Sequence, residues 1–219
     1  MISHLKYDRI NETAVQFVSG KLLDLGCGSQ PFRKLMKANT TTYIGLDLGS
    51  PDMEQRAEVI GSASDVPFKT GSFDTVLCTE VIEHVSEPWL VMDQISRVLR
   101  PGGVLILTSP LIARIHGAPR DFYRFTPYGL EHMASKVGIE TVSISPMGGF
   151  GQMMAYMFSF FWERVIDRRF RPRGYLGQVL RSALSWLGPL AYWIGKVIDR
   201  VEFDDRNSWN HVYVGKRVQ

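Results

Sequence analysis

Short apolar runs alternate with amphipathic segments along the first two thirds of the chain. The runs lack polar alternation, as is typical of strands covered on both faces. The segments between them repeat apolar residues three and four positions apart, as in helices that pack on a sheet. Strands are expected at 21–25, 41–46, 58–60, 73–79, 104–108, 139–145 and 209–216, and helices at 3–19, 32–38, 88–100 and 127–138. This rhythm predicts an α/β fold, a doubly wound, seven-stranded and mainly parallel sheet with right-handed crossovers.

The first strand leads into a glycine turn, in the stretch KLLDLGCGSQPF at 21–32. Asp24 lies near the strand end, Gly26 and Gly28 flank Cys27, and Pro31 is expected to open a helix. Two glycines let a backbone pass close to a ligand because no Cβ intervenes. Ligands of open α/β sheets bind at the carboxyl ends of the strands, so a nucleotide site is expected here. An ordinary strand–turn remains the alternative.

Two further acids follow strand ends. Asp47 comes about 20 residues after the glycine turn, where a carboxylate can bind both hydroxyls of a ribose. Asp65 can accept a hydrogen bond from a base amine, with Val66 against the ring. The alternatives are a loop aspartate that caps the next helix at Asp47 and a turn aspartate at Asp65.

Five motifs occur in order, LLDLGCG, YIGLDL, SASDVPF, FDTVLCTEVIEHV and LRPGGVLILT. In sequence and spacing they resemble class I S-adenosylmethionine-dependent methyltransferases, in the branch that includes the ubiquinone/menaquinone-biosynthesis-type enzymes. The resemblance covers about residues 20–145 and implies a Rossmann-like fold. Gln30 replaces the third glycine often found in the first motif. A dinucleotide-binding enzyme needs a small residue there for close helix–strand packing, so Gln30 argues against NAD more than against S-adenosylmethionine.

The resemblance implies S-adenosylmethionine as the cofactor and assigns its parts to the strand ends. The methionine end falls to Asp24, Gly26 and Gly28, with the backbone of Cys27. The resemblance assigns the ribose to Asp47.

The same resemblance assigns the remaining parts of the cofactor. Leu48 packs on the adenine, and Asp65 and Val66 flank it. Glu80 and Val81, after the fourth strand, face the sulfonium, and His84 follows about one helical turn later.

The segment 109–126 follows the fifth strand and therefore reaches the ligand side of the sheet. Asp121, Tyr123 and Arg124 are the expected substrate-binding residues; alternatively, Asp121 and Arg124 pair and hold the loop. A hydroxyl acceptor needs a base, and His116 and His84 are the candidates because imidazole titrates near neutrality. No metal site is expected, since no Cys/His cluster has metal-binding spacing.

An apolar insertion, 147–208, separates the sixth and seventh strands of a methyltransferase domain at 1–146 and 209–219. It holds two long helical stretches, 152–170 and 175–202, the second broken at Pro189, with five arginines between 164 and 173. A membrane span needs roughly 20 apolar residues, and charges interrupt both stretches. Either the insertion packs as a cap, on the domain or on a second copy of the chain, or it binds a membrane surface through aromatic and arginine side chains.

The composition of the chain bears on its partners, the state of its cysteines and its cellular location. The 219 residues carry a net charge of +3, which does not suggest nucleic acid as a partner. The two cysteines, Cys27 and Cys78, are expected to be reduced thiols. The first residues lack a signal-peptide apolar core. A cytoplasmic protein is expected, with contact to the inner membrane face as an extension.

The resulting hypothesis is methyl transfer from S-adenosylmethionine to a small-molecule, glycan or lipid-linked acceptor. One alternative is a non-catalytic protein that binds S-adenosylmethionine as a scaffold at a membrane surface. The other is an NAD-dependent oxidoreductase.

Overall fold

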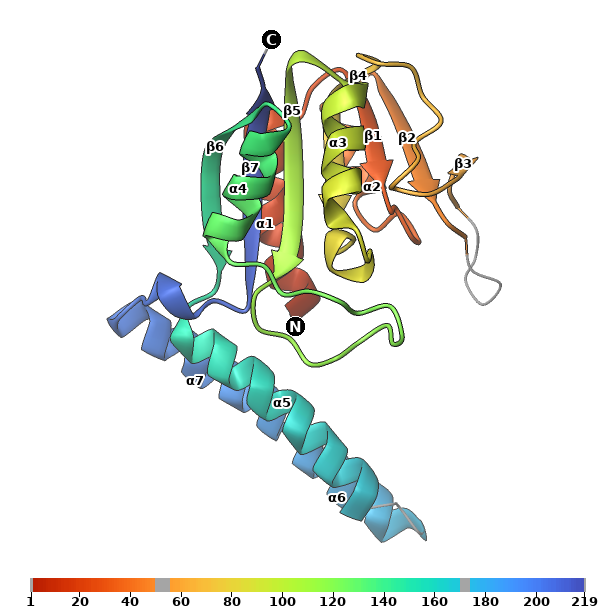
Figure 1. Ribbon diagram of the computed structural model, residues 1–219. Helices are drawn as coiled ribbons and strands as arrows, with labels where there is room; N and C mark the ends of the chain where they lie inside the picture. Colours follow the sequence, from red (N-terminus) through yellow and green to blue (C-terminus); the bar gives the residue numbers. More distant parts are fainter. Residues whose placement is uncertain (1, 50–55, 170–173, 219) are drawn as a thin grey trace. The chain divides into compact units, whose positions relative to one another are not determined.

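Figure 1 shows the computed structural model, in which residues 2–49, 56–169 and 174–218 are described. The chain divides into two compact units. One consists of Leu5–Ser145 with His211–Gln219, and the other of Pro146–Asn210 with Met1–His4.

The first unit is built on a seven-stranded sheet in the order β3-β2-β1-β4-β5-β7-β6. The bounds are β1 Lys21–Leu25, β2 Thr42–Asp47, β3 Val59–Ile60, β4 Phe73–Thr79, β5 Leu99–Pro110, β6 Ile139–Met147 and β7 Asn210–Arg217. Strands β3, β2, β1, β4 and β5 pair in parallel. Strand β7 runs in the opposite direction to β5 (Figure 1). The predicted doubly wound sheet is confirmed.

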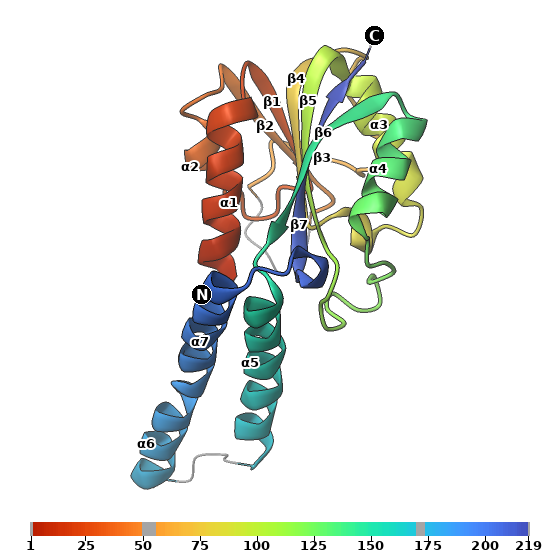
Figure 2. The same cartoon turned by 90° about the vertical axis from the view of Figure 1, so that its left-hand side faces the viewer.

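Helices cover both faces of this sheet (Figure 2). One face carries α1, Ile2–Phe17, and the four-residue α2, Arg33–Met36; the other carries α3, Pro88–Val98, and α4, Pro127–Lys136. Thr126 caps α4 by accepting a hydrogen bond from the Gly129 amide, and Pro127 occupies the first turn, as the sequence predicts. Buried apolar residues of β1, β4, β5 and α3 form the main core.

Two element boundaries differ from the expectation. Helix α3 ends at Val98 rather than Arg100, because Leu99 is already extended and pairs with Phe73 of β4. Strand β5 therefore runs through the Pro-Gly-Gly sequence that was expected to separate helix from strand. Helix α2 begins after Phe32, so Pro31 lies in the preceding turn instead of opening the helix.

The second unit is helical: α5 Phe150–Arg169, α6 Gly174–Ser185 and α7 Leu187–Val201. The break between α6 and α7 falls at Trp186, so Pro189 lies in the first turn of α7, where its missing amide costs nothing. Asp199 of α7 accepts hydrogen bonds from the amides of Gly149, Gly151 and Gln152, the unpaired donors at the start of α5. None of the described helices combines the length and the hydrophobicity that a membrane span requires.

Candidate functional site

A cavity of about 550 Å³ lies at the carboxyl ends of the central strands. Gly26 follows β1, Asp47 ends β2 and Glu80 follows β4, so three neighbouring strands contribute to its wall. The volume lies within the range of small-molecule sites. The wall consists of the strand ends, one loop before β4, and two segments further along the chain: Gly26, Leu46, Asp47, Leu48, Gly61–Ser64, Glu80, Val81, His84–Ser86, Gly117, Arg120 and Phe122.

The glycine turn is held against β2. The amides of Gly26 and Cys27 both donate to the carbonyl of Leu46. Gly28 has a positive φ of 49°, and its amide donates to Asp47 Oδ2 at 2.9 Å. Asp47 Oδ1 accepts from the Gly49 amide at 3.0 Å. Each carboxylate oxygen has two acceptor positions, so Asp47 keeps acceptor capacity toward the cavity while its orientation is fixed.

Asp24, which is predicted to hold the methionine end of the cofactor, lies in the interior rather than on the cavity wall. Its side chain is only 1% exposed, it is not on the cavity wall, and it accepts a hydrogen bond from the Tyr43 hydroxyl. Its other oxygen has no hydrogen-bond partner among the described residues. Burial raises the pKa of Asp24 to about 7, which the Tyr43 hydrogen bond opposes and the charges of Asp47 and Glu58 reinforce. Direct contact between Asp24 and the cofactor stays a prediction.

The loop before β4 also departs from the expectation. Ser62, Ala63 and Ser64 line the cavity, but Asp65 is not part of the wall and is exposed to solvent. Val66 lies in the core, because its amide donates to Gln94 and its carbonyl accepts from Arg97, both on α3. Leu48, which is 57% exposed and lines the cavity, is an apolar side chain available to a flat ring.

Glu80 adopts a left-handed backbone conformation, with a φ of 56°. Residues other than glycine rarely adopt this conformation, and such backbone strain is concentrated at functional sites. The carboxylate is held at both oxygens. Thr108 donates to Oε1 at 2.8 Å, and Lys6 of α1 forms an ion pair with Oε2 at 2.9 Å. Lys6 therefore takes part in fixing Glu80.

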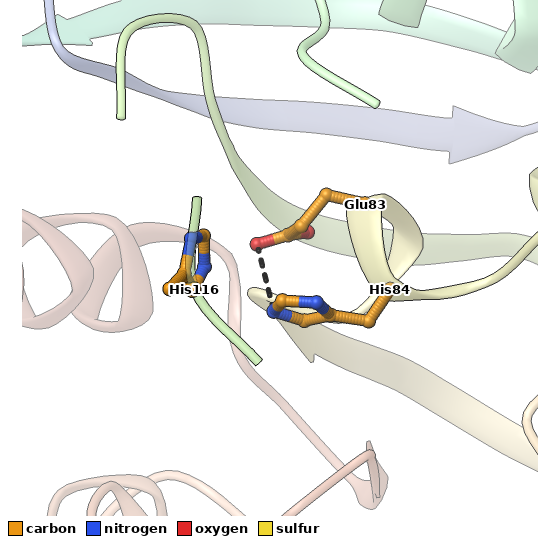
Figure 3. A group of neighbouring side chains, drawn as sticks. All are labelled: Glu83, His84 and His116. Carbon is orange, nitrogen blue, oxygen red and sulfur yellow. Dashed lines mark ion pairs between the residues drawn. The ribbon is translucent and has the colours of Figure 1, made fainter. Parts of the chain in front are cut away.

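Glu83, His84 and His116 gather beside the cavity (Figure 3). Glu83 and His84 belong to the short 3-10 helix η1, Ile82–His84, and His116 comes from the loop after β5. His84 Nδ1 lies 2.6 Å from the Arg120 carbonyl, and His116 Nδ1 lies 3.0 Å from the Arg114 carbonyl. Since carbonyls only accept, both Nδ1 atoms carry the proton, and in the neutral rings Nε2 carries the lone pair. The rings meet edge to face, with centroids 4.7 Å apart.

The residues predicted to bind substrate instead hold the loop. The Arg124 guanidinium pairs with both oxygens of Asp121, at 2.6 and 2.9 Å, and donates to the carbonyls of Ala113 and Arg114. This hydrogen bonding keeps the pKa of Asp121 well below its usual range. The Tyr123 hydroxyl donates to the Ser86 carbonyl. None of these three residues is on the cavity wall, so the alternative interpretation, a loop-holding pair, fits the geometry.

Arg120 and Phe122 do line the cavity, although the sequence pattern gives no sign of a role for either residue. The amide of Phe122 donates to the Glu83 carbonyl at 2.8 Å, which ties this loop to η1. Within residues 120–124, side chains that line the cavity alternate with side chains that hold the loop. The sequence alone does not show which side chains do which, because this depends on the path of the loop.

Comparisons with known proteins give the same class as the fold. Residues 23–107 match the family described as methyltransferase domain. The chain superposes on a SAM-dependent methyltransferase from Archaeoglobus fulgidus with a TM-score of 0.62, at 15% identity, covering 98% of this chain and 94% of the other. It superposes on the 1,6-didemethyltoxoflavin-N1-methyltransferase of Burkholderia thailandensis with a TM-score of 0.59, at 13% identity, covering 98% and 77%. Residues 23–107 thus resemble a methyltransferase domain, and the unit that contains them has the class I, Rossmann-like fold.

Two curated relatives are more similar in sequence. The 27-O-demethylrifamycin SV methyltransferase of Amycolatopsis mediterranei is 30% identical over 131 residues, 53% of this chain and 44% of the relative. The ubiquinone biosynthesis O-methyltransferase of Xanthomonas oryzae pv. oryzae is 30% identical over 120 residues, 46% of this chain and 50% of the relative. The chain thus spans about half the length of these relatives.

Proposed function

We propose that the protein transfers a methyl group from S-adenosylmethionine to a hydroxyl group of a small-molecule or lipid-linked acceptor. The observation that carries the proposal is the cavity at the ends of β1, β2 and β4, where a glycine turn, Asp47 and Glu80 meet. Both curated relatives described above are named for methylation at oxygen, which supports a hydroxyl acceptor.

The residues of the cavity fit the cofactor. A Cβ at Gly28 would have no atom within 4 Å, so the turn leaves open space beside its backbone. Asp47 offers a fixed carboxylate for a ribose diol, and Leu48 an apolar surface for an adenine. Glu80 places negative charge where the resemblance puts the sulfonium. When bound, S-adenosylmethionine supplies a methyl group made electrophilic by its positive sulfur.

The protein must align the acceptor with the methyl group and remove a proton from the acceptor. Arg120 and Phe122 form the far part of the wall and can hold an acceptor against the strand ends. Positioning of two reactants can supply about 7–11 kcal/mol of the barrier. A hydroxyl must also lose its proton. His84 lies on the same wall, with His116 beside it, and is the candidate base.

Calorimetric titration with S-adenosylhomocysteine and with NAD tests the cofactor. Binding of the first alone supports the proposal, while binding of NAD alone would favour the oxidoreductase. Radiolabelled cofactor added to the protein with a lysate and a lipid extract tests the transfer. A labelled small molecule or lipid is the expected product, and cofactor binding without any labelled product would favour a non-catalytic scaffold.

We further propose that the helical unit contacts an anionic membrane surface, where a lipid-linked acceptor would be reached. The support is its exposed apolar side chains beside cations: Phe161, Trp186 and Trp193 are largely exposed, and Arg164 and Arg168 adjoin Phe161. Flotation with anionic and with neutral vesicles tests this. Binding to anionic vesicles only is expected, and a stable dimer without vesicle binding would favour self-association instead.

A further inference from the structure

The loop between β5 and α4 has a fixed backbone where it lines the cavity. It extends beyond the carboxyl ends of the central strands (Figure 1). The amide of Phe122 donates to the Glu83 carbonyl at 2.8 Å, and the amide of Arg120 donates within the loop at 3.0 Å. The Arg120 carbonyl accepts from His84 Nδ1 at 2.6 Å. Both backbone polar groups of Arg120 are therefore engaged, which fixes the point on the wall from which its side chain extends.

The guanidinium of Arg120 is exposed, and it has no hydrogen-bond or ion-pair partner among the described residues. The other arginine near it in the loop differs in this respect. Arg124 pairs with both oxygens of Asp121, at 2.6 and 2.9 Å. Asp121 is the one acidic residue of this loop in the sequence, and its carboxylate is thereby already taken. The loop therefore holds one guanidinium in a structural pair and leaves the other available at the cavity.

The other charged residues of the cavity wall have partners in the protein. These residues are Asp47 and Glu80. Asp47 accepts hydrogen bonds from two backbone amides, and Glu80 forms an ion pair with Lys6 at 2.9 Å. Within the described part of the wall, Arg120 is thus the residue with a permanent charge that no other side chain offsets. The cavity therefore presents an uncompensated positive charge on the side that this loop forms.

A guanidinium in this position favours an acceptor with negative charge. An acceptor that fills the cavity takes water away from Arg120, and the loss of hydration of a charged group is costly unless a counter-charge or hydrogen bonds replace it. A guanidinium presents its N–H donors in a planar fork, which fits two oxygens of a carboxylate or a phosphate. The pair of Arg124 with Asp121 shows this arrangement within the same loop. An acceptor that carries such an oxyanion offsets the lost hydration, and a neutral acceptor does not.

We propose that the acceptor carries an oxyanion, a carboxylate or a phosphate, in addition to the hydroxyl that is methylated, and that Arg120 binds this oxyanion. The substrate class is then a hydroxy acid or a phosphorylated hydroxy compound. This inference names the acceptor of the proposed function and rests on that function. Arg120 is a binding residue in this arrangement, since it holds the acceptor and takes no part in the bonds that form and break.

The same contacts place the oxyanion close to the hydroxyl. Arg120 and His84, the candidate base, are joined by a hydrogen bond of 2.6 Å, so the two residues are direct neighbours on the wall. Phe122, which is 49% exposed and lines the same wall, offers an aromatic surface two positions further along the loop. A flat ring that bears both a hydroxyl and an oxyanion suits this combination of an aromatic surface, a guanidinium and an imidazole.

Calorimetric titration of the full chain with phenyl phosphate, benzoate and phenol, in excess S-adenosylhomocysteine, tests the proposal. At least one of the two anions should bind at least about tenfold more tightly than phenol, because hydrogen bonds to charged groups are the stronger ones. Arg120→Gln should abolish this preference, and Arg120→Lys, which keeps the charge but not the fork, should retain part of it. Lys69→Gln removes an exposed cation outside the wall and should leave the preference unchanged.

Further comparisons distinguish the sources of the oxyanion. Tighter binding of phenyl phosphate than of benzoate assigns a phosphate, and the reverse assigns a carboxylate. Tighter binding of soluble dihexanoyl phosphatidate than of phenyl phosphate assigns a lipid headgroup, and the reverse assigns a free small molecule. Each of these results supports the proposal if Arg120→Gln abolishes the binding preference.

Binding of S-adenosylhomocysteine is measured on every variant to show that it is folded. Phenol binding as tight as that of the anions, no binding of any anion, or an equal preference in the wild type and Arg120→Gln would each overturn the proposal. If S-adenosylhomocysteine still binds, these results leave the proposed function intact. A preference for anions that depends on Arg120, in a protein that binds no S-adenosylhomocysteine, would instead support the oxyanion site and contradict the proposed function.

Discussion

The amide of Gly28 donates to Asp47 Oδ2 at 2.9 Å, so the glycine turn after β1 and the acid at the end of β2 are locked together. The two residues lie 19 positions apart in the chain. The Asp47 carboxylate therefore both holds the turn and faces the cavity. Its removal should weaken ligand binding in two ways, by loosening the turn and by removing an acceptor from the cavity.

Asp47→Ala should weaken binding of S-adenosylhomocysteine by about ten- to a hundredfold, since hydrogen bonds to a charged group are worth about 1.5–3 kcal/mol. Calorimetric titration measures the change. Asp65→Ala is the matched control, because Asp65 is exposed and away from the cavity wall. An equal loss in both variants would contradict the assignment of Asp47 to the cofactor.

The buried carboxyl of Asp24 should make stability depend on pH. Its folded-state pKa is raised to about 7 from 3.8 by burial, so between these values the folded state holds a proton that the unfolded state has released. The stability contribution is fully present below the unfolded pKa and is lost as pH rises through about 7.

Asp24→Asn keeps an acceptor for the Tyr43 hydroxyl but cannot ionise. From pH 5 to pH 8, the wild type should lose on the order of 2 kcal/mol more unfolding free energy than the variant. Urea unfolding at both pH values measures this difference. Parallel pH profiles in the two proteins would show that Asp24 does not titrate in this range.

The left-handed conformation of Glu80 can be tested with a pair of variants. Both Glu80→Ala and Glu80→Gly remove the contacts with Lys6 and Thr108, but only glycine adopts the observed φ of 56° without strain. The glycine variant should be more stable than the alanine variant by about 1 kcal/mol, while both bind S-adenosylhomocysteine more weakly than the wild type. Thermal unfolding gives the first comparison, and equal stability of the two would contradict the backbone assignment.

Helices α5 and α7 cross where Gly151 and Gly195 meet. A Cβ added to Gly195 would lie 2.4 Å from the Gly151 carbonyl oxygen, which belongs to backbone and cannot rotate away. Gly195→Ala should therefore destabilise the helical unit by about 1–3 kcal/mol and speed hydrogen exchange in α5 and α7. Gly188→Ala is the control, since its Cβ would meet nothing closer than 3.5 Å. Unchanged exchange in Gly195→Ala would mean that the helices do not cross there.

The doubly wound, mainly parallel sheet and the ends of the central strands were predictable because both follow from the sequence pattern. Apolar runs that end at Gly26 and Asp47 mark β1 and β2, and parallel strands bring their carboxyl ends to one edge. Side-chain direction was harder to predict. Asp65 and Val66 are neighbours in a short loop, and only the hydrogen bonds from α3 decide that Val66 is buried and Asp65 exposed.

The grouping of Glu83, His84 and His116 was not predictable from the sequence. The sequence places His116 more than 30 positions after the other two, and its approach depends on the loop held by Asp121 and Arg124. The sequence expectation of no metal site rested on local Cys/His spacing and stays a prediction.

Strand β7 lies between β5 and β6, although the helical unit separates it from both in sequence. During synthesis, the ribosome must therefore add roughly 60 residues after β6 before the strand that pairs with both neighbours emerges. At about 5–20 residues per second, the nascent domain would spend several seconds with two open strand edges. That interval makes the unfinished sheet a target for chaperones and for pairing with other nascent chains.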